Sequence, residues 1–353
     1  MKKVTSKQVA ELAKVSQATV SLILNNSQKV TFSDETRERV LAAAKQLGYK
    51  LPSYDPKKNF NHKLLLFVPT LANYYFIELV QYVQGYAITQ GYNVMICNTF
   101  RNKEIERMYL NLAQEMDGII YTYIPNFPKE LEQIAQKIPV IMIGEKKKNL
   151  NICSIELSNH ISAALIAEHL YELGHRKFMF LSTPLAQFSL SREQRLQGLQ
   201  NTFEQYGLEN AITVVTPDAS SEKENMVSAD SYEYQVGRRL LLNALDQGLD
   251  RGITAIICVN DMTAYGAMIA LKEKGMRIPQ DISLCGFDNI APSFLTTPTL
   301  TSVDHHLKER CKSAIDMLLQ WYEKGYDPTP SVNKIEYTPR LVIRQSTGKP
   351  RAI

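Results

Sequence analysis

The stretch VAELAKVSQATVSLILN, residues 9–25, holds two short apolar runs at helical spacing, separated by a polar break at residues 14–16. Each run covers only about eight residues, which is too short for an isolated helix to be stable in water. A third run at helical spacing, DETRERVLAAAKQLGY, follows at residues 34–49. Three such helices can bury one shared core, so residues 1–50 are expected to form a small three-helix domain.

Capping residues mark the expected helix ends. Thr5 followed three positions later by Gln8 has the form of a capping box, in which each residue satisfies a free backbone N–H of the first turn. Ser16 and Ser33 stand where they can cap the second and third helices. The apolar side chains expected to face the shared core include Val9, Leu12, Ala13, Val20, Ile23, Val40, Leu41 and Ala44.

Two short helices joined by a tight turn form a helix-turn-helix, whose second helix can enter the major groove of DNA. Ala10 is small where the two helices must approach, and Val15 is apolar inside the turn. Residues 1–62 hold eleven Lys and Arg against five Asp and Glu, a net charge of +6, whereas the remaining chain carries −2. This asymmetry favours a polyanionic partner. The alternative is an ordinary three-helix bundle with a solvated basic surface.

The rest of the 353-residue chain has a different pattern. Residues 51–62, LPSYDPKKNFNH, have the composition of a linker. From residue 63, apolar runs of strand length alternate with helical patterns, as in LLLFVPT, YNVMICNT, KFMFLST and ISLCGFD. Strands that alternate with helices predict doubly wound parallel sheets of the α/β class. About nine strands are expected over this length, which favours two sheets over one.

Several classes of protein are not supported by the sequence. No apolar run is long enough to span a bilayer, and the basic N-terminus lacks the apolar segment of a secretion signal, so the cytoplasm is expected. The five cysteines are scattered without a CxxC pair, which predicts neither a disulfide framework nor a metal site. The motifs GxxxxGK[ST], GxSxG and HExxH, and a GxGxxG after a strand, are missing. We therefore expect no enzyme activity, no catalytic residues and no cofactor.

The sequence VTSKQVAELAKVSQATVSLILN, followed by TRERVLAAAKQLGY, resembles the DNA-binding headpiece of the LacI/GalR family of bacterial transcription regulators. The likeness continues through RLQGL, AIICVNDMTAYGAMIALKEKGMRIPQDISLCGFDN, PTLTSVD and PRLVIRQST. It implies a headpiece at 1–50, a hinge at 51–62 and a two-lobed core at 63–353, similar to periplasmic sugar-binding proteins. Lobe 1 would comprise 63–160 and 291–323, and lobe 2 would comprise 161–290 and 324–353, with the chain crossing near residues 160, 290 and 324.

The resemblance assigns DNA contacts within the headpiece. Gln17, Ala18 and Leu22 match the positions that contact bases, and Gln17 can form a bidentate pair with adenine. Leu22 stands where the family usually has arginine, so the operator is expected to differ from the common family site. Lys14 replaces a usual glycine, so either it adopts a left-handed backbone or the turn is altered. The positions that match phosphate contacts are Thr5, Ser16, Thr19, Ser21, Asn25 and Thr31.

The hinge departs from the family pattern. Family members usually carry an Ala-rich hinge helix ending in a leucine that wedges into the minor groove. Here Pro56 interrupts that segment, and Asn59 or Phe60 stands near the leucine position. Either a helix begins at Pro56 with Phe60 as the wedge, or the segment is a plain flexible linker, since proline inside a helix removes a hydrogen bond.

In the core, the resemblance assigns an effector site. Arg195 offers an arginine fork for hydroxyls or a carboxylate, and Asp288 at a strand end can accept from two sugar hydroxyls. Gly144 and Glu145 stand where relatives often have Asp and Arg. The residues expected to bind the effector are Tyr75, Phe76, Arg195, Tyr232, Asn260 and Asp288.

The implied function is a sequence-specific repressor of carbohydrate genes. A homodimer would bind double-stranded operator DNA, and a sugar or sugar derivative between the lobes would change its affinity. A dimer is expected because the tail lacks a leucine heptad for tetramers. One alternative is a regulator of the same family that needs a purine or nucleoside co-repressor, or a phosphocarrier protein. A second is a solute-binding protein, which would require export.

Overall fold

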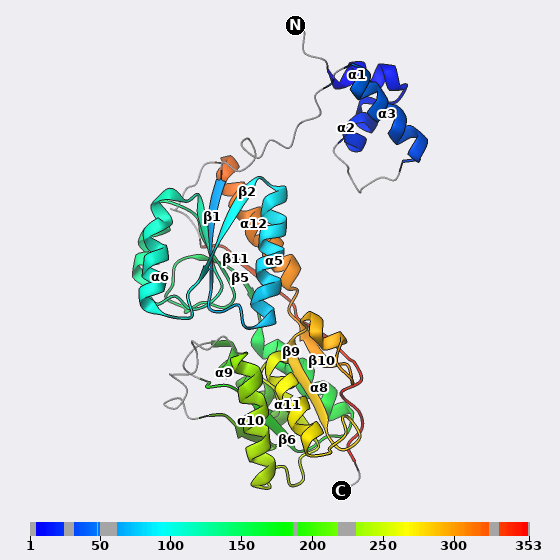
Figure 1. The fold of residues 1–353 in the computed structure, drawn as a ribbon. Coiled ribbons are helices and arrows are strands. Elements are labelled where there is room, and N and C mark those ends of the chain that lie inside the picture. The colour runs from blue at the N-terminus through cyan, green and yellow to red at the C-terminus, as the bar shows by residue number, and fades with distance from the viewer. Residues whose placement is uncertain are drawn as a thin grey trace. The chain divides into compact units, whose positions relative to one another are not determined.

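The structure is a computed structural model that describes residues 5–24, 32–47, 49, 62–185, 190–217, 231–324 and 332–351. The chain forms two compact units, residues 1–61 and residues 62–353 (Figure 1). In the first unit the described residues form three helices: α1 (Ser6–Ala13), α2 (Gln17–Leu24) and α3 (Asp34–Gln46).

Local hydrogen bonds set the ends of the headpiece helices. The Thr5 amide donates to the Gln8 side-chain oxygen at 2.9 Å, which confirms the expected N-terminal box of α1. The Ser16 hydroxyl accepts from the Thr19 amide at 3.0 Å and begins α2. Between these helices Lys14 has a φ of 53° and a ψ of 46°, so the first of the two expected alternatives holds. The glycine-like conformation of the turn is kept, at a cost of roughly 1–2 kcal/mol for a residue with a side chain.

The headpiece core differs from the expected one at two leucines. Val9, Ala10 and Ala13 are buried on α1, but Leu12 is 43% exposed, and Leu41 on α3 is 44% exposed. A helix turns by about 100° per residue, so each leucine points roughly 100° away from the centre of the buried face. The residues that form this core are Val9, Ala10, Ala13, Val20, Ile23, Val40, Ala43 and Ala44.

The second unit contains two lobes, each built on one sheet. In the described residues the first sheet is parallel throughout, in the spatial order β11 (Lys334–Tyr337), β5 (Cys153–Leu157), β4 (Val140–Ile143), β3 (Gly118–Tyr121), β1 (His62–Val68) and β2 (Tyr92–Asn98). Helices cover both faces: α5 (Tyr74–Thr89) and α12 (Leu307–Lys324) on one, α6 (Lys103–Leu110), η1 (Asn111–Glu115) and α7 (Pro128–Ile134) on the other. Central strands are therefore apolar on both sides.

The second sheet has the same plan with one reversed strand. Its order is β12 (Arg340–Val342), β10 (Thr301–Asp304), β9 (Ser283–Asp288), β8 (Ala255–Cys258), β6 (Phe178–Leu181) and β7 (Ile212–Val215), and β12 is antiparallel to β10. One face packs against α10 (Tyr232–Asp246) and α11 (Asp261–Glu273), and the other against α8 (Asn159–Glu172) and α9 (Leu190–Gln205). The short helix η3 (Ala291–Phe294) lies between β9 and β10.

The chain exchanges lobes at three places, two of which differ from those expected. It leaves the first lobe between Leu157 and Asn159. The second exchange follows Asp304 rather than residue 290, because β10 pairs with β9 in the second sheet. The third follows Tyr337 rather than residue 324, because β11 returns to pair with β5 in the first sheet. Residues 291–304 therefore belong to the second lobe and residues 334–337 to the first.

Two glycines allow α10 and α11 to pack closely. A Cβ atom on Gly237 would lie 2.3 Å from the Thr263 carbonyl oxygen, and one on Gly266 would lie 2.1 Å from the Tyr234 carbonyl oxygen. Both contacts are with backbone, which cannot move aside as a flexible side chain can. The helix pair therefore depends on the missing side chains at these two positions.

We expect Gly266→Ala to lower the free energy of unfolding by about 1–3 kcal/mol or more, because α10 and α11 must separate. Gly85→Ala is the matched control, since Gly85 lies within α5 and nothing lies within 4 Å of its added Cβ. That control should be neutral or gain up to roughly 1 kcal/mol from better helix propensity. Urea unfolding of both variants measures the difference, and equal stabilities would contradict this packing argument.

Candidate functional site

The headpiece presents the side chains expected to contact DNA at the start of its helices. Gln17 begins α2 and is exposed, and its amide nitrogen donates to the Ser6 hydroxyl of α1 at 2.9 Å. The Ser16 and Thr19 hydroxyls lie 2.8 Å apart at the same end of α2, and Thr5 precedes α1. The N-terminus of a helix favours a phosphate through its backbone N–H groups and its dipole. These residues therefore lie together at the N-terminal ends of α1 and α2, and their contacts with DNA stay predictions.

Other expected DNA contacts lie outside the described residues. The backbone of α2 includes Ala18, Ser21 and Leu22, but their side chains are not among those that the structure describes. Further expected contacts beyond the described part of the chain are Asn25, Thr31, Asn59 and Phe60. Their roles, and the two alternatives for the hinge, stay predictions.

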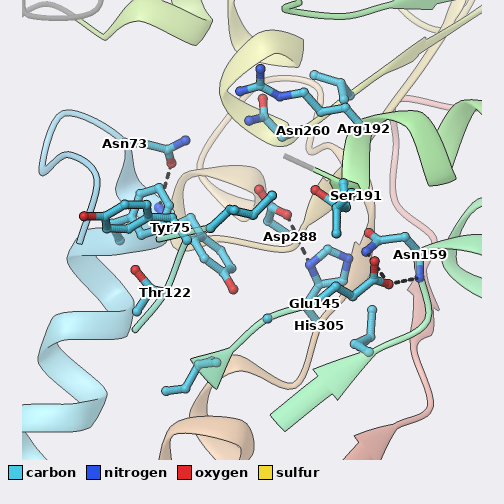
Figure 2. A pocket seen from close by; sticks show the side chains of 18 of the residues that line it. Asn73, Tyr75, Thr122, Glu145, Asn159, Ser191, Arg192, Asn260, Asp288 and His305 are labelled. Atoms are coloured by element: carbon cyan, nitrogen blue, oxygen red, sulfur yellow. Dashed lines mark hydrogen bonds and ion pairs between the residues drawn. The ribbon is translucent and has the colours of Figure 1, made fainter. Parts of the chain in front are cut away.

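A cleft lies between the two lobes of the core, at the carboxyl ends of strands from both sheets (Figure 2). Its empty volume is about 970 Å³, part of which is open solvent at the mouth. Ligands of open α/β sheets bind at this edge, because the loops and helix N-termini that follow the strands converge there. Five of the six expected effector residues line it: Tyr75, Phe76, Arg195, Asn260 and Asp288.

Arg195 is the centre of the polar network in the cleft. It is 7% exposed, and its guanidinium donates to Asn159 Oδ1 at 2.8 Å and to the Val259 carbonyl. Its Nη2 lies 3.5 Å from Asp288 Oδ1, and the group stacks 4.6 Å from the centre of the Phe287 ring. Most of its N–H groups thus donate to other parts of the protein. Arg195 therefore holds Asp288 and Asn159 in place, besides offering its remaining N–H groups to the cleft.

Asp288 faces the cleft from the last position of β9. Its φ of 105° is rare for a residue with a side chain, and the next residue, Asn289, also has a positive φ of 51°. His305 Nδ1 donates to Asp288 Oδ1 at 3.1 Å. Burial lowers the pKa of His305 to about 4, which outweighs the opposite effect of the Asp288 hydrogen bond. The ring is therefore neutral at pH 7, and its Nε2 is a buried acceptor with no hydrogen-bond partner among the described residues.

A buried carboxyl group beneath the cleft supports the Asp288 loop. Asp261 is fully buried and accepts from the Ser293 hydroxyl at 2.6 Å, the Ser302 hydroxyl at 2.6 Å and the Ile290 amide at 3.2 Å. These donors come from η3, from β10 and from the loop after β9. Burial raises the pKa of Asp261 to about 8, although the three hydrogen bonds act in the opposite direction. One neutral side chain thus ties together the segment that carries Asp288.

The first lobe contributes an acid opposite this network. Glu145 follows β4, and its Oε1 accepts from the Asn159 side chain at 3.0 Å. Its Oε2 is buried and has no hydrogen-bond partner among the described residues, and burial raises the pKa of the carboxyl group. Figure 2 shows Glu145, Asn159 and His305 together on one side of the cleft. This side of the cleft is rich in hydrogen-bond acceptors.

The remaining expected residues differ in their positions. Asn260 caps α11 through its carboxamide oxygen, which accepts from the Thr263 amide at 2.9 Å, so its nitrogen is left as a donor toward the cleft. Tyr75 lies in the cleft beside Phe76, with ring centres 5.2 Å apart and nearly perpendicular planes. Tyr232 is not among the lining residues and packs against the core of the second lobe. The neighbouring Glu233 lines the cleft in its place.

Sequence reasoning missed several polar residues of the cleft. They are Arg101 after β2, Asn159 at the start of α8, Arg192 one turn before Arg195, Glu233 and His305. Their common signal is position, because each one follows a strand closely or begins the helix after it. Of this set, Arg192 was the easiest to find, since residues three apart on a helix share a face.

Comparison with known proteins gives two family matches and close relatives over the whole length. Residues 5–52 match the bacterial regulatory proteins of the lacI family, and residues 167–347 match a periplasmic binding protein-like domain. The chain is 32% identical to the ribose operon repressor of Halalkalibacterium halodurans over 97% of each chain. It is 31% identical to the HTH-type transcriptional repressor PurR of Proteus mirabilis, over 98% of this chain and 97% of the relative.

Solved structures of similar fold include regulators with DNA and with a sugar. The lac repressor dimer bound to operator and the anti-inducer ONPF has a TM-score of 0.68 at 25% identity, covering 98% of this chain and all of that one. A LacI family regulator from Enterococcus faecium with bound ribose has a TM-score of 0.67 at 20% identity, covering 81% and 99%. The second likeness is one of fold alone.

The raised pKa of Asp261 predicts a specific dependence of stability on pH. The folded pKa of about 8 exceeds the ordinary aspartate pKa of 3.8, so the native state binds the extra proton between these values. The free energy of unfolding should therefore fall as pH rises through this window, by at most about 1.4 kcal/mol per pH unit. We expect Asp261→Asn, which cannot ionise, to remove this loss relative to the wild type.

Urea unfolding at several pH values between about 5 and 8 measures this difference. Asp246→Asn is the control, because Asp246 is exposed and paired with Lys274 on the surface. Its pH dependence should match that of the wild type. If the unfolding free energy of Asp261→Asn fell with pH as that of the wild type does, the conclusion that the Asp261 carboxyl group is neutral would be wrong.

Proposed function

The chain belongs to the lacI family of bacterial regulatory proteins, and we propose that it represses carbohydrate genes under the control of a small effector bound in the cleft. The headpiece binds double-stranded operator DNA through α2, and the effector changes that affinity. The protein then acts in the cytoplasm, where operator DNA lies. The relatives compared above are repressors by name, which favours a regulator over an enzyme or a solute-binding protein.

One continuous chain of side chains across the cleft carries this proposal. His305 and Arg195 contact Asp288 in the second lobe, Arg195 contacts Asn159 at the exchange between lobes, and Asn159 contacts Glu145 in the first lobe. A ligand whose hydroxyl groups bind Asp288 and Glu145 competes with the protein side chains that these two carboxyl groups contact. If the ligand binds one arrangement of the lobes more tightly than another, it shifts the protein toward the arrangement that it binds more tightly.

A homodimer is part of the proposed function. Helix α5 leaves Tyr74 47% and Ile77 37% exposed, and these two residues lie one turn apart on the same face of the helix. Apolar side chains that adjoin on one surface are typical of a contact with another protein. A second copy that covered them would place two headpieces in one assembly, as a near-palindromic operator requires.

A purine or nucleoside remains the alternative effector. The similarity to PurR supports it, and the aromatic rings of Tyr75 and Phe76 in the cleft suit the face of a base as well as that of a sugar. The acceptor-rich side formed by Glu145, Asp288 and His305 favours a ligand with many hydroxyl groups. We therefore keep the sugar class as the main proposal.

The proposal predicts an operator response that depends on Asp288. Genomic DNA fragments that the protein binds identify the operator. Fluorescence anisotropy then measures the affinity of the protein for the operator with and without sugars, sugar derivatives, purines and nucleosides. At least one compound should change the affinity about fivefold or more, and Asp288→Asn should reduce that response because the carboxylate acceptor is lost. Selection of no specific DNA site would end the proposal of a repressor.

Gln17 is expected to carry part of the base recognition. Gln17→Ala should weaken specific operator binding by roughly 1–3 kcal/mol while leaving binding to scrambled DNA nearly unchanged, because a bidentate base contact is lost. Gln46→Ala is the control, since Gln46 is an exposed residue of the same type at the end of α3. Equal losses on operator and scrambled DNA would assign Gln17 to the DNA backbone instead.

A further inference from the structure

Two arginines line the cleft from opposite lobes. Arg101 follows β2 in the first lobe, and Arg192 lies in the first turn of α9 in the second lobe. Arg192 is 8% exposed, and its Nη1 donates to the Pro184 carbonyl at 2.9 Å, which fixes the guanidinium in place. Arg101 lies 5.5 Å from the centre of the Tyr123 ring. Arg192 is therefore buried, and Arg101 is partly buried.

The backbone at Arg101 is held in an unusual conformation. Phe100 and Arg101 have φ values of 50° and 56°, a left-handed pair of residues that both carry side chains. Such a conformation costs roughly 1–2 kcal/mol for each residue. Strain of this kind tends to occur at functional sites, where the surrounding structure holds it. Here it accompanies the placement of a cation in the cleft.

Arginines outnumber acids in the lining of the cleft, which holds Arg101, Arg192, Arg195 and Arg310 against Glu145, Glu233 and Asp288. Burial lowers the pKa of Arg101 to about 10, and the neighbouring charge of Arg192 acts in the same direction. Burial also lowers the pKa of Arg192. Glu233 opposes both effects, and Glu106 opposes the effect on Arg101. Glu106 already accepts hydrogen bonds from the Tyr121 and Tyr123 hydroxyls. The helices α9 and α11 begin at the cleft as well, so their N-termini add to the positive potential.

The two ends of the cleft therefore differ in character. Figure 2 shows Arg192 and Asn260 on one side, Glu145 and His305 on the other, and Asp288 between them. Donors gather at the first side and acceptors at the second. A ligand that satisfies both needs an anionic group at one end and hydroxyl groups at the other.

We propose that the effector is a sugar carrying an oxyanion, a phosphate ester or a carboxylate, which is held between Arg101 of the first lobe and Arg192 of the second. Its hydroxyl groups bind the acceptors of Glu145, Asp288 and His305. This inference rests on the proposed function of the cleft as the effector site. Because the two arginines belong to different lobes, the oxyanion bridges the lobes directly and favours their closed arrangement.

A neutral sugar fits this cleft less well. Closing the lobes over it would remove two guanidinium groups from water in a cleft whose lining holds more arginines than acids, and burying net charge is costly. An oxyanion accepts charge-assisted, bidentate hydrogen bonds from both arginines, which are about twice as strong as neutral ones. The same ligand thus neutralises the excess charge and supplies the acceptors.

Thermal unfolding and calorimetry of the full chain without DNA test the proposal. The probes are inorganic phosphate, glucose 6-phosphate, glucuronate and glucose, tested on the wild type and on the variants Arg101→Gln and Arg192→Gln. The wild type should be stabilised by inorganic phosphate and by at least one anionic sugar more than by glucose. Each variant should weaken that binding roughly 10- to 100-fold, because one charged donor group is lost.

Three controls keep the result interpretable. Arg107→Gln removes an arginine outside the cleft, stacked 4.1 Å from Phe127 and paired with Glu130, and should bind the anions like the wild type. Arg101→Lys and Arg192→Lys retain the positive charge and should recover part of the affinity for anions. Such a recovery shows that the glutamine variants lost anion binding through the missing charge and not through misfolding. Any anion bound by the basic headpiece contributes equally to all variants.

The outcomes separate the sources of the oxyanion and the two proposals. Response to glucose 6-phosphate alone assigns a phosphate ester, and response to glucuronate alone assigns a carboxylate. The inference is overturned if neither glucose 6-phosphate nor glucuronate stabilises the wild type more than glucose does, or if Arg101→Gln and Arg192→Gln bind anions unchanged. A neutral compound that altered operator affinity through Asp288 would preserve the proposed repressor and remove only the anionic effector.

Discussion

The buried guanidinium of Arg195 is the interaction on which the rest of the core depends. It reaches the start of α8, the loop after β8 and the end of β9, which are separate segments of sequence. Asn159 extends this network to Glu145 in the first lobe. A group that is buried with charge needs such partners, because an isolated cation would be expelled from the interior. Arg195 thus links the geometry of the second lobe to the position of the first.

The strands and helices explain why the cleft can be both rigid and responsive. Parallel strands place their carboxyl ends at one edge of each sheet, so polar residues that follow them meet there without disturbing the apolar faces. Asp261, Ser293 and Ser302 hold the Asp288 loop from below. The groups that face the cleft, by contrast, come from both lobes and share acceptors across it. Rigidity therefore lies within each lobe, and adjustability lies between them.

Much of the fold follows from local sequence, and the exceptions have physical reasons. The box at Thr5 and Gln8, the cap at Ser16 and the alternation of strands and helices depend on neighbouring residues, and such patterns are readable. Periodicity alone placed Leu12 in the core wrongly. The buried face of α1 is formed by Val9, Ala10 and Ala13, and Leu12 points away from that face. The lobe exchanges at Asp304 and Tyr337 depend on long-range pairing with β9 and β5. Arg101 follows β2 closely, which is a local signal, but its place in the cleft also depends on its left-handed backbone and on the second lobe, which the sequence pattern does not show.

The late return of the chain to both sheets has a consequence for how the protein is made. Strand β11 completes the first sheet and β12 completes the second, and the two lie close together in the sequence, at residues 334–342. During synthesis, neither edge can be closed until residue 342 has left the ribosome. The described headpiece helices pack on a core drawn from residues 9–49, so this unit has no such requirement. DNA-binding units would thus be folded on nascent chains whose regulatory lobes are still unfinished, and the two lobes mature together once β11 and β12 have emerged.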